Sequence, residues 1–152
     1  MPSKQLLLFE EITPETGKKI YAGGYSEIVL CTDGGDTDVM RAICEYLLRH
    51  PKLIYVTGRC QSAGVLIAAA GNEVIAYPGV EWLHHNASGE ADGKKGDMQM
   101  WAEYLRRNDR WANCFLQERT GRAASHWASD AYDERVFTNE EAIEWGLVDR
   151  EV

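Results

Sequence analysis

One serine in this chain occupies a position where a nucleophile could form a covalent intermediate. Ser62 lies between an apolar, β-type run at residues 53–56 and a run of small, helix-compatible residues at 65–70. At such a strand-to-helix junction the first backbone N–H groups of the helix lack intrahelical partners and point toward any oxyanion beside the hydroxyl. The pattern predicts an acyl-transfer nucleophile. A helix N-cap is the alternative for a serine at this place.

An acyl-transfer serine needs a base, and two adjacent histidines are candidates. His84 and His85 end an apolar segment. Because side chains alternate along a strand, we expect at most one of them to share a site with Ser62. A thiol nucleophile at Cys60 is the competing chemistry, although a small buried residue at the end of a strand explains Cys60 as well.

An orienting acid and a second oxyanion donor also have candidates. Asp130, Asp133 and Glu134 form an acidic cluster, which without other information is typical of a solvated surface loop. The turn at residues 33–36 contains Gly34 and Gly35, whose backbone could approach a substrate closely. Only the joint order of turn, serine, histidine and acid favours a catalytic site over separate structural roles.

The elements that must position these residues follow from alternating β-type and helical patterns. Strand, helix and strand in succession predict right-handed βαβ crossovers and a mostly parallel sheet in an α/β domain. The expected strands are residues 27–31, 52–57, 73–77 and 80–85, with an amphipathic helix after the turn that carries Val39, Ile43, Tyr46 and Leu47 on one face.

The second half of the chain is predicted to be mainly helical. Residues 86–95 read as a polar loop, and residues 96–120 as one long helix that ends at Gly121. Its aromatic faces could pack against another subunit or against the core of the same domain. Thr138 and Glu141 match a capping box that opens a last short helix.

Composition bounds the function further. The 152 residues suit one domain, and the net charge of −8 argues against non-specific binding to nucleic acid or to anionic membranes. The cysteines show no metal-ligand spacing and read as reduced thiols, which predicts a cytoplasmic protein. No run of residues approaches the length of a membrane span or forms a signal peptide.

Four segments, read together, resemble the proteolytic subunit of the Clp protease, the ClpP family. The family's Ser-Pro-Gly-Gly, its serine motif Gly-x-Ala-Ala-Ser-Met-Gly-Ala, its Pro…Ile-His-Gln-Pro strand and its Ser-x-x-Glu-Ala-x-x-Tyr-Gly-Leu-Ile/Val-Asp ending correspond to residues 32–35, 58–65, 78–87 and 138–149. From Pro78 to Asp149 the register needs no gap, and it places Asp97 and the pair Thr120-Gly121 on matching family positions. The resemblance covers about residues 28–149.

The resemblance implies roles for the candidate residues. Ser62 takes the place of the nucleophile, and the count from Pro78 puts the family's general base on His85. The backbone N–H groups of Gly35 and Ala63 take the place of the oxyanion donors. Ala63 stands where the family has methionine, which changes the side chain and leaves the N–H in place.

The acid is the main departure from the family pattern. The ungapped register puts Glu134 where the family usually has aspartate, and a local shift of one residue would bring Asp133 there instead. We favour Glu134. The longer side chain also leaves open a weakened or lost triad.

The resemblance further implies a ClpP/crotonase-type fold, with a βαβ superhelical core and residues 96–121 as a projecting handle helix. One domain would comprise residues 1–152, with no metal or organic cofactor. The implied activity is that of an ATP-dependent Clp-type serine endopeptidase, which acts on peptides or unfolded proteins inside homo-oligomeric rings stacked through the handle helices.

One segment and two rival functions limit this expectation. Residues 1–27 form a short N-terminal segment without the family's hairpin and full first helix, which argues against docking of a AAA+ unfoldase and resembles divergent phage-type members. A catalytically silent assembly protein and a crotonase-type acyl-CoA enzyme are the alternatives. The joint presence of Ser62 and His85 in the family register argues against the second.

Overall fold

A computed structural model of the chain describes residues 3–152 and contains a six-stranded, parallel sheet. The strand order is β1-β2-β3-β4-β6, and β5 pairs with the far end of β3. The strands are β1 Gln5–Phe9, β2 Glu27–Thr32, β3 Leu53–Gln61, β4 Glu73–Ala76, β5 Glu81–Leu83 and β6 Arg150–Glu151. The predicted α/β class with a parallel sheet is confirmed, and β1 and β6 are additions at its edges.

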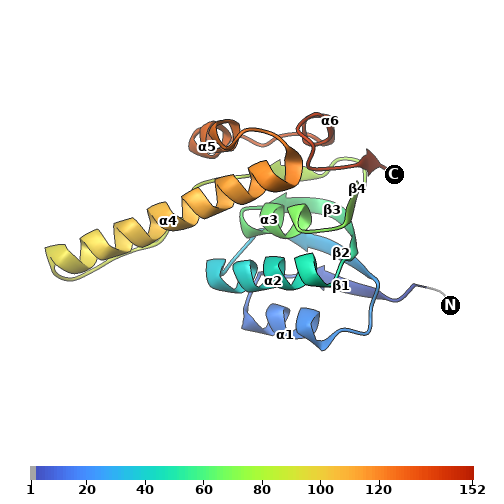
Figure 1. Ribbon diagram of the computed structural model, residues 1–152, viewed down its shortest axis with the longest axis horizontal. Helices are drawn as coiled ribbons and strands as arrows, with labels where there is room; N and C mark the ends of the chain where they lie inside the picture. Colours follow the sequence, from blue (N-terminus) through green and yellow to red (C-terminus); the bar gives the residue numbers. More distant parts are fainter. Residues whose placement is uncertain (1–2) are drawn as a thin grey trace.

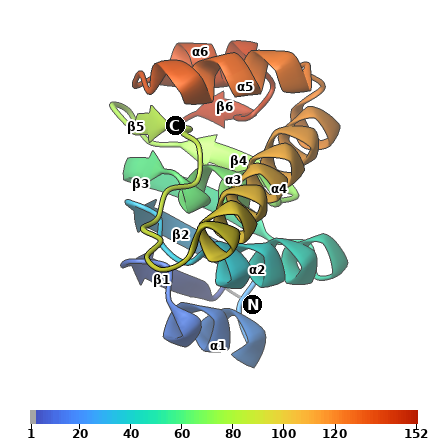
Figure 2. The same cartoon turned by 90° about the vertical axis from the view of Figure 1, so that its left-hand side faces the viewer.

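Helices follow the strands and cover one face of the sheet, as Figure 2 shows for α1, α2, α3 and α4. The six helices are α1 Pro14–Ala22, α2 Thr37–Arg49, α3 Ala63–Ala69, α4 Lys95–Thr120, α5 Ala124–Asp133 and α6 Asn139–Glu144. Alternate residues of β2 are buried beneath the helices, as expected for a strand with one covered face. The capping box predicted at Thr138 and Glu141 opens α6 as expected.

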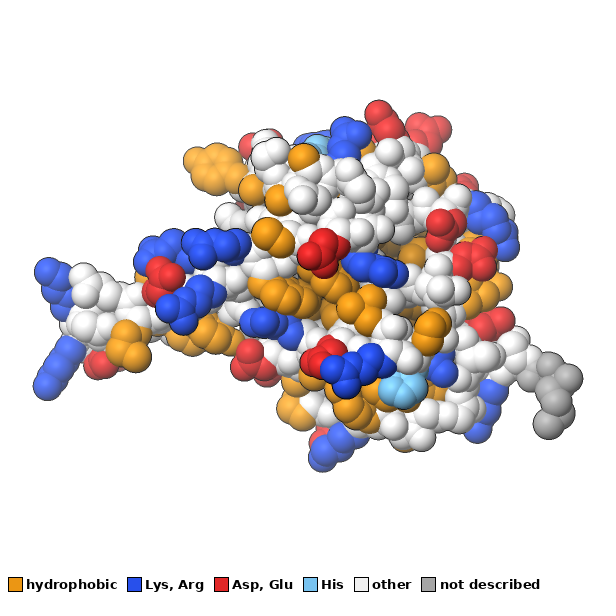
Figure 3. Space-filling view, in the orientation of Figure 1, with side chains coloured by type: hydrophobic (Ala, Val, Ile, Leu, Met, Phe, Trp, Pro, Cys, Tyr) orange, Lys and Arg blue, Asp and Glu red, His pale blue; other side chains and the backbone are white. Residues whose placement is uncertain are grey.

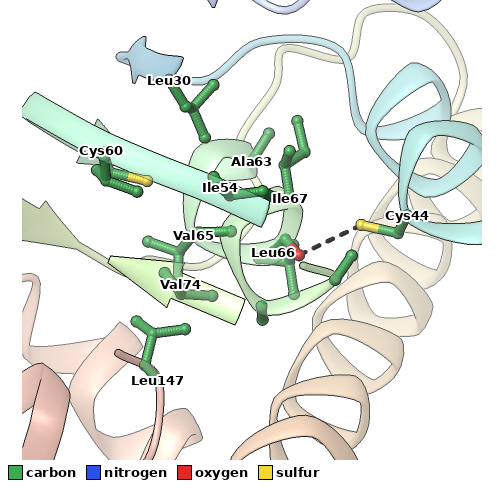
Figure 4. Close-up of a cluster of buried hydrophobic side chains, with 14 of the residues drawn as sticks. Leu30, Cys44, Ile54, Cys60, Ala63, Val65, Leu66, Ile67, Val74 and Leu147 are labelled. Carbon is green, nitrogen blue, oxygen red and sulfur yellow. Dashed lines mark hydrogen bonds between the residues drawn. The ribbon is translucent and has the colours of Figure 1, made fainter. Parts of the chain in front are cut away.

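The core lies between the sheet and α2 and α3 (Figure 4). Every residue of α3 is buried, because its small side chains let the helix lie close to the strands. Gly64 is required there, since a Cβ atom would lie 2.6 Å from Thr32 Cγ2. Across the interface with α2, the Cys44 thiol donates to the carbonyl oxygen of Leu66 at 3.4 Å.

Helix α4 has two halves with different surroundings (Figure 1). Its C-terminal half packs on the core through Phe115 and Leu116, and Arg119 donates to the carbonyl oxygen of Ala69 at 2.8 Å. Its N-terminal half projects from the domain, and Figure 3 shows hydrophobic side chains exposed along it. Met100 is 74% exposed. The C-terminal half therefore packs on the core of the same domain, and packing of the exposed N-terminal half against another subunit stays a prediction.

Gly121 ends α4 in the left-handed conformation with φ 79°, as the sequence predicts. Within residues 3–152, no helix is both long enough and apolar enough to cross a membrane.

Candidate active site

Ser62 occupies the sharp turn between β3 and α3. Its backbone has φ 55° and ψ −122°, a conformation that a residue with a side chain adopts only where the surrounding structure enforces it. The Ser62 N–H donates to the carbonyl oxygen of Leu83 at 2.7 Å and thereby ties the turn to the end of β5. The side chain makes no capping hydrogen bond to α3, so the N-cap alternative is wrong. The turn presents the hydroxyl to its surroundings in the way a nucleophile requires.

The glycine turn at residues 33–36 packs directly against this serine. A Cβ atom on Gly34 would lie 2.7 Å from Ser62 Cβ and 3.1 Å from Ser62 Oγ, so no side chain fits at this position. Gly35 has φ 154°, and its own Cβ would lie 2.3 Å from the carbonyl oxygen of Ile12. Two hydrogen bonds of 2.9 Å fix the turn to Ile12, one to the oxygen of Gly34 and one from the N–H of Asp36. The turn is thus held beside Ser62 by close backbone contact.

Ser62 and His85 line the same small cavity, of about 30 Å³, beneath the C-terminal half of α4. Both histidines border it, but their side chains differ in burial: the burial of residues alternates from Glu81 to His85, with His84 buried and His85 partly buried. This pattern agrees with the expected alternation of the two side chains, although β5 itself ends at Leu83, and the expectation that only one of them shares a site with Ser62 stays a prediction. No hydrogen bond joins the Ser62 and His85 side chains in the described part of the chain, so what they share here is the cavity that both line.

The environments of the two histidines separate their roles. His84 is 2% exposed, and its Nε2 bonds Asn113 Oδ1 at 2.8 Å while its ring meets the edge of Trp127. Burial lowers the pKa of His84, and the bond to Asn113 opposes this, so a neutral ring is favoured. His85 is only partly buried and remains accessible to a substrate. His84 is therefore a structural residue of the handle contact, and His85 remains the predicted base.

The predicted oxyanion donors belong to two different elements, the start of α3 and the glycine turn. Ala63 is the first residue of α3 and lines the cavity with Ser62, so its N–H falls outside the intrahelical hydrogen bonds. Gly35 is exposed and borders two hollows, of about 560 Å³ and about 360 Å³. The smaller hollow runs between the glycine turn, Ala87 and the exposed part of α4. An extended chain crossing from one hollow to the other would pass Gly35.

The acidic candidates lie on a different element from the one expected. Asp130 and Asp133 belong to helix α5, so reading the cluster as a surface loop is wrong; helical hydrogen bonding continues to the end of α5. Glu134 follows in the left-handed conformation with φ 51° and ψ 38°. Glu134 and Asp133 are both exposed and lie outside the cavity that holds Ser62.

A backbone bridge nevertheless brings the predicted acid segment toward the histidines. Trp82 and Phe137 pair antiparallel and exchange both backbone hydrogen bonds, at 3.3 and 2.9 Å. Three residues onward from Trp82 and three residues back from Phe137, this register reaches His85 and Glu134 together. The left-handed backbone at Glu134 interrupts the extended register there. The assignment of Glu134, with Asp133 as the alternative, stays a prediction.

Cys60 does not have the environment of a nucleophile. Its side chain is fully buried, and burial raises the pKa of its thiol well above the usual value. A thiolate is therefore disfavoured, and the competing thiol chemistry has no support. Across residues 3–152, no cluster of His, Cys, Asp or Glu side chains is arranged to hold a metal ion.

Sequence reasoning missed the contribution of α4 to the cavity wall. Asn108, Asp109 and Ala112 line the cavity opposite Ser62. Asn108 is 5% exposed, and its Nδ2 has no partner among the described residues. The sequence did contain a signal for this contribution, a pair of adjacent polar residues in the helix. The prediction for that helix rested only on its aromatic positions. The direction in which these side chains point depends on how α4 is rotated about its own axis where it crosses β5. The local sequence pattern does not determine that rotation.

Comparison with known proteins agrees with this architecture. A family model described as Clp protease matches residues 4–152. Over 122 residues, 76% of this chain, the sequence is 32% identical to ATP-dependent Clp protease proteolytic subunit 4 of Rhodococcus jostii, and it spans 62% of that relative's length. It is 25% identical over 151 residues to proteolytic subunit 1 of Corynebacterium glutamicum and spans 69% of that protein.

A solved structure shows the same fold. A ClpP1 mutant from Listeria monocytogenes superposes with a TM-score of 0.81 over 97% of this chain and 90% of the other, at 19% sequence identity. The predicted ClpP-type fold is confirmed. With a family match from residue 4 to residue 152 and a sheet, serine turn and handle helix in the expected order, the chain belongs to the Clp protease family.

Proposed function

We propose that this protein is a serine endopeptidase of the ClpP type, with Ser62 as nucleophile and His85 as general base. The observation that carries the proposal is the forced backbone of Ser62, wedged against Gly34 in a cavity that His85 also lines. A serine that does not cap its helix and is held in this conformation needs another role. The oxyanion donors proposed here are the N–H groups of Gly35 and Ala63.

In the proposed reaction, Ser62 Oγ attacks the carbonyl carbon of a peptide bond while His85 takes the hydroxyl proton. The carbonyl oxygen becomes an oxyanion that the two N–H groups stabilise. His85 then donates the proton to the amide nitrogen, the C–N bond breaks, and an acyl ester remains on Ser62. Water, deprotonated by His85, hydrolyses the ester and releases the second product with Ser62 restored. Glu134, or Asp133 in its place, stabilises the imidazolium.

The proposed substrate is an extended segment of peptide or unfolded protein. Two hollows adjoin Gly35, and the one toward α4 is bordered by Ala87, Ser88 and Trp101. An extended chain across this place would expose a backbone carbonyl to Ser62. Gly35 borders both hollows, so a chain that occupied both would extend on either side of this proposed oxyanion donor, which favours cleavage within a chain over removal of a terminal residue.

Assembly into stacked homo-oligomeric rings through α4 is part of the proposal. The exposed side chains of Met98, Met100 and Tyr104 line the projecting half of α4, and a monomer leaves this apolar surface in water. Dependence on ATP would come from a AAA+ unfoldase partner. Helix α1 is only nine residues long, so it offers an unfoldase a smaller docking surface than the family's full first helix would. The four free cysteines suit a reducing, cytoplasmic setting.

A catalytically silent assembly subunit is the second candidate. The exposed, left-handed Glu134 outside the Ser62 cavity favours it, because an acid that does not reach His85 leaves the base without an orienting partner.

Hydrolysis of an internally quenched peptide by the assembled protein separates the two candidates. We expect turnover by the wild type and its loss in Ser62→Ala and His85→Ala. His50→Gln is the matched control, because it removes an exposed imidazole at the end of α2 that does not line the Ser62 cavity. Equal rates for Ser62→Ala and wild type, or no turnover by either, would exclude the peptidase and favour the silent subunit.

A further inference from the structure

A carboxylate outside the predicted triad shares the cavity with Ser62 and His85. Asp109 lies on α4, is partly buried, and lines the cavity from the side of the handle helix. Its Oδ1 accepts the backbone N–H of Ala87 at 2.7 Å. Ala87 is two residues beyond His85 along the chain, so Asp109 restrains the segment that carries the proposed base.

A second contact from the same helix restrains the other side of that base. Asn113 follows Asp109 by one helical turn, so the two side chains share a face of α4. Asn113 Oδ1 meets His84 Nε2 at 2.8 Å, and Asp109 Oδ1 meets the Ala87 N–H. The two contacts bracket His85. Its backbone is thereby fixed against α4 on both sides, although it lies beyond the last residue of β5.

The charge of Asp109 also suits the proton transfer proposed for His85. Burial raises the pKa of the Asp109 carboxyl, and both the Ala87 amide and the charge of His85 lower it. A carboxylate in the cavity that His85 also lines is suited to stabilise the imidazolium that forms when His85 takes the Ser62 proton. By contrast, Glu134 is exposed, and it lies outside the cavity.

We propose that Asp109 is a positioning residue for His85, holding the base through Ala87 and stabilising its protonated form. The inference rests on the proposed function, because it takes His85 to be the general base. Asp109 supplies a negative charge from the handle helix. This charge adds to that of the predicted acid at the end of α5, Glu134 or Asp133. The helix proposed to stack the rings thus also carries part of the catalytic arrangement.

A kinetic experiment with three substitutions tests this role. Asp109→Asn keeps an acceptor oxygen for the Ala87 N–H and removes the charge, Asp109→Ala removes both, and Asp109→Glu restores the charge. Glu118→Gln, an exposed position on the same helix, is the control for loss of one negative charge. The reaction of Ser62 with a fluorophosphonate probe gives a maximal rate constant, kinact, and an apparent affinity, KI.

We expect kinact to fall about tenfold in Asp109→Asn and further in Asp109→Ala, with KI within about twofold of the wild type. Asp109→Glu should recover part of the loss, and Glu118→Gln should match the wild type. Amide hydrogen exchange at Ala87 should accelerate in Asp109→Ala and stay slow in Asp109→Asn, since only the first loses the acceptor.

The outcomes separate this inference from the function on which it rests. A wild type that reacts with the probe and an Asp109→Asn variant with unchanged kinact would overturn the role of Asp109 alone. A change confined to KI would also overturn it, by assigning Asp109 to probe binding. A folded, assembled wild type that never reacts would overturn the proposed function and this role with it. If Asp109→Ala fails to fold, Asp109→Asn still decides, because it is nearly isosteric.

Discussion

Replacement of the buried Asp130 should make the protein more stable at neutral pH. The Asp130 side chain is 2% exposed, and neither carboxyl oxygen has a hydrogen-bond partner in the described residues. The closest cation is Arg135, whose Nε lies 3.6 Å from Oδ1 and which also pairs with Glu141 at 2.9 Å. Burial raises the pKa of Asp130 from 3.8 to about 6, opposed by Arg135 and aided by Glu141 and Asp133.

The change in stability follows from the difference between the pKa of Asp130 in the folded state and its pKa in the unfolded state. Because the pKa in the folded state is higher than in the unfolded state, folding is most favourable when Asp130 is protonated in both. Stability from this group therefore declines as pH rises from 3.8 toward about 6 and is level above that. At ~1.4 kcal/mol per pKa unit, the gap corresponds to about 3 kcal/mol. The Arg135 contact already lowers this pKa, so the value of about 3 kcal/mol includes its favourable contribution.

We therefore expect the free energy of unfolding of Asp130→Asn to exceed that of the wild type by about 3 kcal/mol at pH 7.5. Urea denaturation followed by tryptophan fluorescence, at fixed protein concentration and several pH values, measures the difference. The gain should shrink steadily below pH 6. Asp133→Asn, exposed on the same helix, should show no such gain. A variant less stable than the wild type at pH 7.5, or a difference independent of pH, would refute the reasoning.

Three further predictions concern the site and the assembly. Gly35→Ala should slow reaction of Ser62 with a fluorophosphonate by about 100-fold or more, because the new Cβ displaces an oxyanion donor; an unchanged rate would contradict this. Met100→Glu should lower the assembled mass in light scattering, because it charges the exposed apolar side of α4; an unchanged mass would exclude this half of α4 from the interface. Glu134→Gln should reduce peptide turnover more than Asp133→Asn does, and the reverse order would show a register shift of one residue.

Local patterns predicted most of the fold, because each element carries its own signal. Apolar β-type runs located β2, β3 and β4 to within a few residues, and Gly121 marked the end of α4. Strand β1 was missed because its outward-facing residues are apolar too: Leu7 is 57% exposed, so the run lacks the polar alternation of a surface strand. The two-residue β6 is too short for any periodicity.

Only those parts of the site that depend on residues close together in the sequence were predicted. The serine turn and the Gly34-Gly35 turn are local features, and both lie where expected. The contact of Asp109 with Ala87 depends on how α4 lies across the end of β5, and the burial of Asp130 depends on how α5 packs. These are properties of tertiary packing, and the polar residues involved look like ordinary helix-surface positions in the sequence.

The most direct test of the central claim is to find which residue a fluorophosphonate modifies in the assembled protein. Mass spectrometry of the digested adduct should place a single phosphonate on the peptide that contains Ser62, and the adduct should be absent from Ser62→Ala and His85→Ala. His50→Gln, which removes an exposed imidazole at the end of α2, should still carry it. A folded, assembled wild type without any adduct, or an adduct on another residue that persists in Ser62→Ala, would contradict the assignment of Ser62 as the nucleophile.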